Sequence, residues 1–437
     1  MTQENSTEKW IRVVGLCAIG FLLMVTYAIA RPATKSLFLQ EYGSKNLPYA
    51  WIAVAFCVVL AVSFYNRWVT RFPLMRMFGG TIAISSALML VFLVAALLDS
   101  KPAIFALYVW KDIYIVIMVE IFWSFSNVVF PIKTARWAYG LFCMMGSLGG
   151  LVGHLGVGPL SHRVETIHTL WFIFPIFGLI WLITNYFSNR VGETTASISE
   201  YKTASLRQGF QVVRNSRYLV LLLLLVATVQ IVVTLIDFQY SRSLELTYTN
   251  TNQRTAIIGQ VFALINVGSI ILEMLTGPIL RFVGVPLALL SIPLMLGSAI
   301  GALLVWPKFL MVVVAKVTSK STTYSIFKAA KEILYIPLSY EEKTQGKAVV
   351  DMLTYRLAKG VASVMLLVLA AFHAFPLTGL EGVFEIESLV QVFRTLQESP
   401  ALLLTIFGLT IVWFGLTLAI VRRYRQSVSR EQELAPN

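Results

Sequence analysis

The chain consists mainly of long apolar runs, and this feature restricts its fold more than any other. A helix needs roughly 20 apolar residues to cross a bilayer, and by that measure the chain has about twelve membrane spans. They lie near residues 13–30, 50–68, 77–98, 103–125, 137–157, 170–187, 218–238, 256–276, 283–305, 309–334, 349–372 and 401–421. Hydrophobic residues make up 57% of the 437, and charged residues 13%, against about 25% in soluble domains. The predicted fold class is therefore an all-α integral membrane protein.

The first apolar run follows Lys9 and Arg12 and ends in three small or apolar residues, a pattern that also fits a signal peptide. Its apolar core is longer than the roughly 7–15 residues of a signal, so we expect it to be the first span. With the N-terminus cytoplasmic, the inner connections hold roughly 19 Lys and Arg residues and the outer ones roughly 9. This bias predicts a multi-pass protein with both termini in the cytoplasm. We expect the membrane to be a bacterial inner membrane.

The longest inner connection divides the spans into six and six. The sequence therefore predicts an N-terminal six-helix bundle at 1–187, a cytoplasmic linker at 188–217 and a C-terminal six-helix bundle at 218–437. Within the linker, Leu206, Phe210 and Val213 have helical spacing, which predicts an amphipathic helix on the inner leaflet. An acidic interfacial helix is expected at 381–398. Six plus six helices is the plan of the major facilitator architecture, in which two bundles rock about a site near the midplane.

Lysines are concentrated in the tenth span, where residues 316–338 read KVTSKSTTYSIFKAAKEILYIPL. At about 100° per residue, one face of a regular helix carries Lys316, Lys320, Tyr324, Lys328 and Lys331. A lysine at bilayer depth costs about 2.5–3.5 kcal/mol on insertion scales and usually faces water or a partner. We interpret this face as the lining of a pathway for a multiply charged anion. The alternative is a solvated cytoplasmic extension that follows the positive-inside rule.

The first span carries a second basic group. Arg31 and Lys35 are four residues apart and share a helix face with Tyr27. They are candidate substrate-binding residues, unless both side chains extend to the outer surface.

Spans four and seven carry acids. In span four, Lys111 and Asp112 precede Glu120 and Asn127, and Glu120 could pair with a base of another helix, carry a coupling proton or form a structural ion pair. Asp237 is a lone acid in an apolar run, which makes it a candidate site residue unless it reaches the outer surface at the helix end.

The sequence shows no pattern typical of a phosphate-binding loop, a metal site, a nucleic-acid-binding surface or a catalytic site. Gly149 and Gly153 lie in the string GSLGGLVG, which lacks the Gly-Lys-Ser/Thr ending of a phosphate loop and fits a close helix interface. The three cysteines and four histidines show no ligand spacing, so we expect no metal and no cofactor. The net charge of +13 is spread over connections, which argues against nucleic-acid binding. No catalytic constellation is found, and the chain is not expected to be an enzyme.

Several motifs around span ten resemble the nucleotide transporters of the ATP/ADP translocase family of obligate intracellular bacteria and plastids. The most specific pieces are Tyr324-Ser325, Lys331-Glu332, Tyr335-Ile336-Pro337-Leu338, Lys343, Gly346-Lys347 and Asp351, followed by Arg356 and Lys359. Two other segments agree with the family, FWSFSN at 122–127 and Leu235-Ile236-Asp237, as does Thr34-Lys35 after Tyr27 and Arg31. The likeness extends over all twelve spans in order and is specific only around span ten.

The resemblance implies roles for some of the charges. Lys35, Asp237 and Lys331 fall where the family has a lysine, an acid and a lysine implicated in transport. Lys111 stands where the family has a glutamate, and Arg31 is one residue further from its lysine than in the family pattern. These two departures leave the identity of the anion open.

The sequence thus predicts a monomeric membrane transporter of nucleotides, or of a related phosphorylated anion, that works by alternating access. Basic residues would contact phosphate oxygens, and an aromatic ring such as that of Tyr27 or Tyr324 could stack on a base. The first alternative is a major facilitator-type, proton-coupled transporter of another organic anion or a drug-like substrate. The second is a membrane signalling or scaffold protein that retains the fold without transport.

Overall fold

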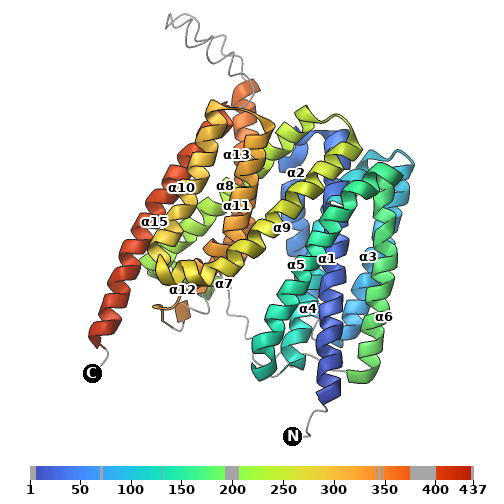
Figure 1. Ribbon diagram of the computed structural model, residues 1–437, viewed down its shortest axis with the longest axis horizontal. Coiled ribbons are helices and arrows are strands. Elements are labelled where there is room, and N and C mark those ends of the chain that lie inside the picture. Colours follow the sequence, from blue (N-terminus) through green and yellow to red (C-terminus); the bar gives the residue numbers. More distant parts are fainter. Residues whose placement is uncertain are drawn as a thin grey trace, which may run out of the picture. The chain divides into compact units, whose positions relative to one another are not determined.

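The computed structural model describes residues 6–68, 72–130, 132–191, 206–339, 341–342, 346–347, 349–374 and 400–434. Within these ranges the secondary structure is helical and contains no strand (Figure 1). The acidic helix expected at 381–398 and Lys343 of the span-ten motif lie outside the described residues. The all-α prediction is confirmed.

The first half of the chain forms six long helices. They are α1 (Ser6–Tyr42), α2 (Leu47–Trp68), α3 (Leu74–Leu97), α4 (Lys101–Val129), α5 (Ile132–Val164) and α6 (Ile173–Val191), with short helical turns η1 (Ser44–Asn46) and η2 (Ile167–Phe172). Each contains one of the first six apolar runs, apart from a few residues at the ends.

The second half begins with α7 (Leu206–Asn215), a short helix inside the segment that we assigned to the linker. The others are α8 (Arg217–Thr247), α9 (Thr251–Phe282), α10 (Val285–Val305), α11 (Phe309–Thr322), η3 (Thr323–Phe327), α12 (Lys328–Leu334), η5 (Val349–Leu353), α13 (Thr354–Ala374) and α15 (Pro400–Leu434). The last six apolar runs coincide with these helices. The division into bundles at 188–217 stays a prediction.

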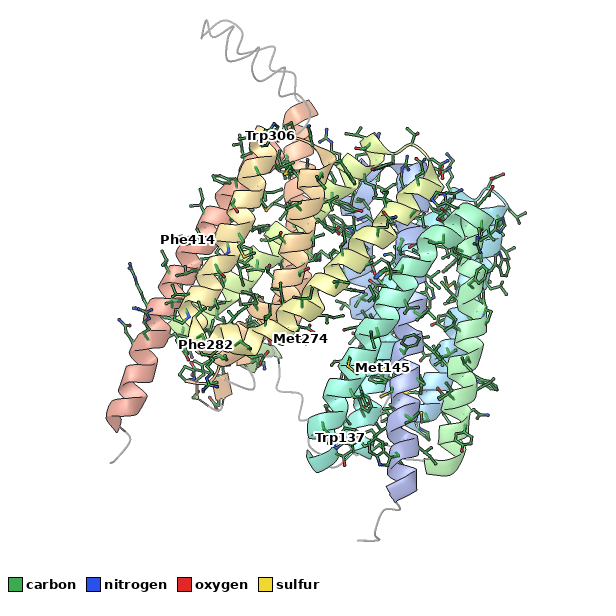
Figure 2. The ribbon with its side chains drawn as sticks, viewed as in Figure 1. Trp137, Met145, Met274, Phe282, Trp306 and Phe414 are labelled. Carbon is green, nitrogen blue, oxygen red and sulfur yellow. The ribbon has the colours of Figure 1, made fainter. Side chains whose placement is uncertain are left out.

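Nine helices among the described residues are long and apolar enough to cross a membrane. The three other runs that we expected to span coincide with α4, with α11 to α12 and with α13, the helices that carry most of the charged candidates. Large apolar side chains project outward, for example Met274, Phe282 and Trp306, which are 77%, 81% and 65% exposed (Figure 2). Apolar surface on this scale is stable in hydrocarbon and not in water, as expected of a multi-pass membrane protein.

The chain divides into two compact units. Unit 1 consists of Met1–Lys202 with Leu244–Val267, and unit 2 of Thr203–Ser243 with Gly268–Asn437. In unit 1, α1 is the central helix and packs against α4, α5 and α6. In unit 2, α10 packs against α11 and α15. The charged candidates of α1 and α4 therefore belong to unit 1, and those of α8 and α11 to α13 belong to unit 2.

The close helix interface expected from the glycines is confirmed between α1 and α5. A Cβ atom on Gly149 would overlap the backbone of Phe21, and one on Gly153 would lie 2.6 Å from the Cβ of Ala28. Real Cβ atoms do not approach other atoms so closely, so the two helices can pack at this distance only because both positions lack a side chain.

We expect Gly149→Ala to lower the thermal stability and the folded yield of the protein, because α1 and α5 would have to move apart. Gly156→Ala is the matched control, since its added Cβ would meet no described atom within 4 Å apart from the backbone of its own helix, and alanine favours a helix over glycine. The measurement is the melting temperature of both purified variants in detergent. Equal melting temperatures would contradict the importance of this contact.

Candidate substrate-binding site

In unit 1, a hydrogen-bonded cluster joins α1 to α4. The Tyr27 hydroxyl donates to Asp112 Oδ1 at 3.1 Å, and Lys111 Nζ donates to Asp112 Oδ2 at 2.9 Å. Lys111 also donates to the Tyr108 carbonyl at 3.0 Å, and its ammonium lies 3.8 Å from the centroid of the Tyr108 ring. Lys111 is buried, so the adjacent carboxylate provides the charge compensation that a buried ammonium requires. Sequence reasoning did not select Asp112 as a site residue, although an acid within an apolar helix was a visible signal.

Arg31 and Lys35 occupy different environments on α1. The Arg31 guanidinium lies 3.9 Å from the ring centroid of Phe262 and 5.6 Å from that of Tyr27. Phe262 lies in the part of α9 that belongs to unit 1, and no charge or spacing in the sequence marks it. Lys35 is 5% exposed, as expected of an interior residue, whereas the alternative predicted a side chain that extends to the surface.

Glu120 and Asn127 lie further along α4, and both are exposed. The Tyr139 hydroxyl of α5 donates to Asn127 Oδ1 at 2.6 Å. Glu120 takes part in none of the ion pairs found among the described residues, so the expected pairing with a base of another helix is not seen there.

The lysine-bearing segment of unit 2 is not one regular helix. A π-helical turn, η3, separates α11 from α12. A π turn bonds residue i to i+5 instead of i+4, so the 100° spacing does not continue across it. The single face that we expected from Lys316 to Lys331 therefore ends at η3. Burial changes at the same point, since Lys316 and Lys320 are buried and Lys328 is exposed.

Lys316 and Asp237 form an ion pair between α11 and α8. The Lys316 side chain is 0% exposed and the Asp237 side chain 20%. The Lys316 ammonium also lies 4.9 Å from the ring centroid of Tyr240, one turn after Asp237 on α8. Asp237, the lone acid of its apolar run, is thus paired with Lys316, one of the lysines on the helix face that we expected to bind the substrate.

Lys320 lies one turn after Lys316 and is 8% exposed. Its ammonium lies 5.4 Å from the ring centroid of Tyr324, which is exposed. Among the residues that the structure describes, no carboxylate forms an ion pair with Lys320. A buried ammonium is costly without a counter-charge, so this position favours an anion.

Lys331 is held by an acid. Its Nζ lies 2.7 Å from Asp351 Oδ1, an atom that also accepts a hydrogen bond from the Tyr335 hydroxyl at 3.1 Å. Asp351 lies in η5, a second π turn, and the sequence placed it in the motif without identifying this pairing. A more exposed pair, Lys347 with Glu332 at 2.5 Å, lies nearby in the chain.

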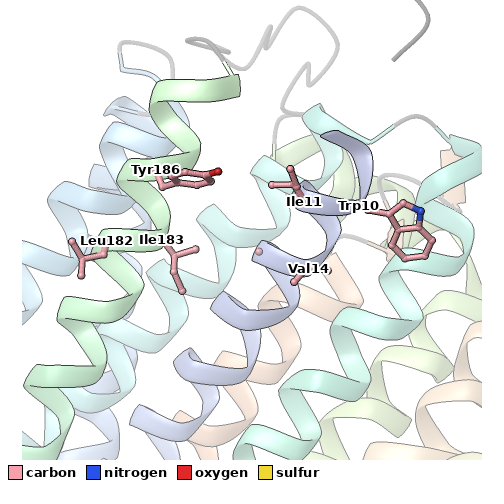
Figure 3. Close-up of a pocket in the computed structure, with 7 residues that line it drawn as sticks. Trp10, Ile11, Val14, Leu182, Ile183 and Tyr186 are labelled. Carbon is pink, nitrogen blue, oxygen red and sulfur yellow. The ribbon is translucent and has the colours of Figure 1, made fainter. Parts of the chain in front are cut away.

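The remaining candidates lie on α13. Lys359 is half-buried, and Arg356 occupies the first turns of the helix, where its side chain is outside the description. An apolar recess of about 570 Å³ in unit 1 lies elsewhere, between the ends of α1 and α6. Trp10, Val14, Ile183 and Tyr186 are among its lining residues (Figure 3). None of the described residues that line this recess is charged, so it does not fit a phosphorylated substrate.

Comparisons with known proteins agree with the motifs of the sequence. A family model described as TLC ATP/ADP transporter matches residues 100–305 and 296–381. The ADP,ATP carrier protein 1 of Chlamydia muridarum is 26% identical over 391 residues, which cover 76% of this chain and 67% of the relative. The ADP,ATP carrier protein 4 of Rickettsia bellii is 22% identical over 395 residues, covering 78% and 72%.

Solved structures resemble the chain in fold. The nucleoside transporter NupG has a TM-score of 0.60 at 12% identity and covers 94% of this chain and 98% of its own. The POT family transporter PepTSo has a TM-score of 0.64 at 11% identity, covering 95% and 98%. A bacterial homologue of the iron transporter ferroportin gives 0.64 at 11%, covering 92% and 98%. The fold is therefore that of major facilitator-like transporters, as the six-plus-six pattern of spans predicted.

Proposed function

The chain belongs to the TLC ATP/ADP transporter family, and from this premise we propose that it exchanges adenine nucleotides across a bacterial inner membrane by alternating access. It is a multi-pass membrane protein whose homologues are carriers, and its substrate is a small anion of the nucleotide class. The excess of Lys and Arg in the inner connections supports cytoplasmic termini.

The main support for this proposal is the environment of Lys320. The lysine is nine-tenths buried and has no acidic partner among the described residues, whereas Lys111, Lys316 and Lys331 are each paired with an acid. A phosphate oxygen would supply the missing counter-charge through a charge-assisted hydrogen bond. We therefore assign Lys320 as the principal phosphate contact of unit 2, and Lys328, Lys331, Arg356 and Lys359 as further basic residues along the same path.

Each unit offers aromatic and basic groups of the kind that bind a nucleotide. Tyr324 is exposed beside Lys320, so its ring is available to stack on a base while the lysine binds phosphate. In unit 1 we propose Lys35 and Arg31 as basic residues able to bind an anionic group, with Tyr27 as an aromatic neighbour. Lys111, Glu120 and Asn127 of α4 remain candidate substrate-binding residues of unit 1, and the Lys111–Asp112 pair adds no net charge there.

The buried charge of Lys320 favours exchange of one nucleotide for another over transport in one direction only. Lys320 has no acidic partner among the described residues, and an uncompensated ammonium is costly inside a membrane, so an empty site should resist reorientation until an anion fills it. A transporter of this kind moves substrate in one direction only when substrate is bound for the return step.

The experiment is uptake of labelled ATP into proteoliposomes loaded with ADP, with empty vesicles as the control. We expect uptake into loaded vesicles only, because the return step requires a bound nucleotide. Absence of uptake by protein that is demonstrably folded would reject ATP/ADP exchange.

Proton-coupled transport of another organic anion is the second candidate. It is favoured by Glu120, an exposed acid that forms no ion pair within the described residues and could carry a proton. A rate that is independent of pH, together with a strict need for substrate on the far side, would exclude it.

A further inference from the structure

The Lys316–Asp237 pair is buried unequally. Lys316 has no exposed side-chain surface, whereas a fifth of the Asp237 side chain is exposed. A ligand can therefore reach the carboxylate and cannot reach the ammonium. Lys316 is thus the more deeply buried partner, and the Tyr240 ring provides a further contact for its charge.

The pair is not explained by stability alone. Removing two charges from water costs several kcal/mol per ion, and well-packed apolar residues of similar volume are often at least as stable. An apolar span that nevertheless contains such a pair is a candidate for function. The pair is also electrically neutral, so Asp237 can lie near a bound polyanion without the repulsion that a lone carboxylate would cause.

Lys316, which pairs with Asp237, lies on the same helix as Lys320. Lys316 and Lys320 are four residues apart within α11, before the π turn, so their Cβ atoms are about 5–6 Å apart on one face. A phosphate bound to Lys320 would therefore lie within one helical turn of the lysine that pairs with Asp237. The part of a nucleotide next to its phosphates is the ribose, which offers hydroxyl donors, and a carboxylate is a strong acceptor for such donors.

We propose that Asp237 binds the ribose hydroxyls of the nucleotide, and that Lys316 is the positioning residue that keeps this carboxylate ionised, oriented and neutralised. The inference rests on the proposed function and adds a determinant of substrate choice to the same site. Its consequence is selection of ribonucleotides over 2′-deoxyribonucleotides, because a site built to accept a hydroxyl rejects the analogue that lacks it.

The test compares ADP with 2′-deoxy-ADP on the purified full-length protein, by the concentration of each that gives half of the maximal thermal stabilisation. For the unmodified protein we expect 2′-deoxy-ADP to need a roughly tenfold or higher concentration, as for the loss of a hydrogen bond to a charged group. In the double variant Lys316→Met/Asp237→Asn the preference for ADP should fall, because the uncharged amide oxygen is a weaker acceptor than the carboxylate. A purely structural pair would change the stability of the variant and leave this ratio unaltered.

Two further variants complete the test. Lys347→Met/Glu332→Gln makes the same change of charge in the more exposed ion pair of unit 2 and should keep the original ratio. Asp237→Glu retains the pair and moves the carboxylate, so it should reduce the ratio even if the double variant does not fold. An unaltered ratio in both Asp237 variants, or equal binding of the two nucleotides by the unmodified protein, would overturn the inference and leave nucleotide exchange intact. Absence of any nucleotide binding would instead reject the proposed function, and the inference with it.

Discussion

Replacement of Lys320 by methionine is expected to lower ATP/ADP exchange by about 10- to 100-fold. A hydrogen bond to a charged group contributes about 1.5–3 kcal/mol, and each 1.4 kcal/mol corresponds to a factor of ten. Methionine has a similar length and is apolar, so the buried position stays filled while the phosphate contact is lost. The folded state itself should not suffer, because an ammonium without an acid among the described residues is costly to bury.

The measurement is the initial rate of ATP uptake into ADP-loaded proteoliposomes, normalised to the amount of folded protein. Lys308→Met is the matched control, since Lys308 is an exposed lysine that precedes the same helix and should leave the rate unchanged. Lys320→Arg keeps the charge and should retain part of the activity. If the Lys320→Met and Lys308→Met proteins transported equally fast, Lys320 would not be the phosphate contact.

Breaking the Lys316–Asp237 pair should destabilise the protein, and the two single substitutions should not be equivalent. Removal of one partner from a buried pair costs roughly 3–5 kcal/mol because a charge remains without compensation. Asp237→Asn leaves the charge on Lys316, which has no exposed side-chain surface, whereas Lys316→Met leaves it on Asp237, which is partly exposed. We therefore expect the larger loss in Asp237→Asn, and partial recovery in the double variant.

Melting temperatures of the three variants in detergent, together with their folded yields, test this order. The same three substitutions in the Lys347–Glu332 pair provide the control, because more exposed ion pairs contribute about 0–1 kcal/mol. A more stable Asp237→Asn than Lys316→Met would show that the burial of Lys316 does not determine the energetics of the pair.

The fold followed closely from the sequence because a bilayer imposes a simple rule. Every apolar run of sufficient length must become a helix, since unpaired backbone groups are not tolerated in hydrocarbon. The twelve runs and the contact at Gly149 were therefore predictable from local composition and spacing. The assignment of residues 244–267 to unit 1 has no such signal, because it depends on contacts between distant parts of the chain.

The sequence predicted which charged residues belong to the candidate site, but it did not predict which of them form ion pairs. Lys316, Lys331 and Asp237 stood out as charges in apolar surroundings, but their partners lie on other helices or beyond a turn whose geometry the sequence does not reveal. Asp351 is the clearest case, since it lies 20 residues after Lys331 and is brought to it through a π turn. Phe262 carried no signal at all, because one more phenylalanine in an apolar span is indistinguishable from packing.

The π turn at Thr323–Phe327 has a consequence for comparing this chain with its relatives. A π turn is geometrically an α-helix that has gained a residue, so the rotation of everything after it depends on residue count as well as on residue identity. A relative that lacks the extra residue would present the counterpart of Lys331 about 100° around the helix axis. Two chains with the same lysines at matched positions can therefore direct them at different neighbours, and a single insertion or deletion is enough to redistribute charge between the two sides of one helix.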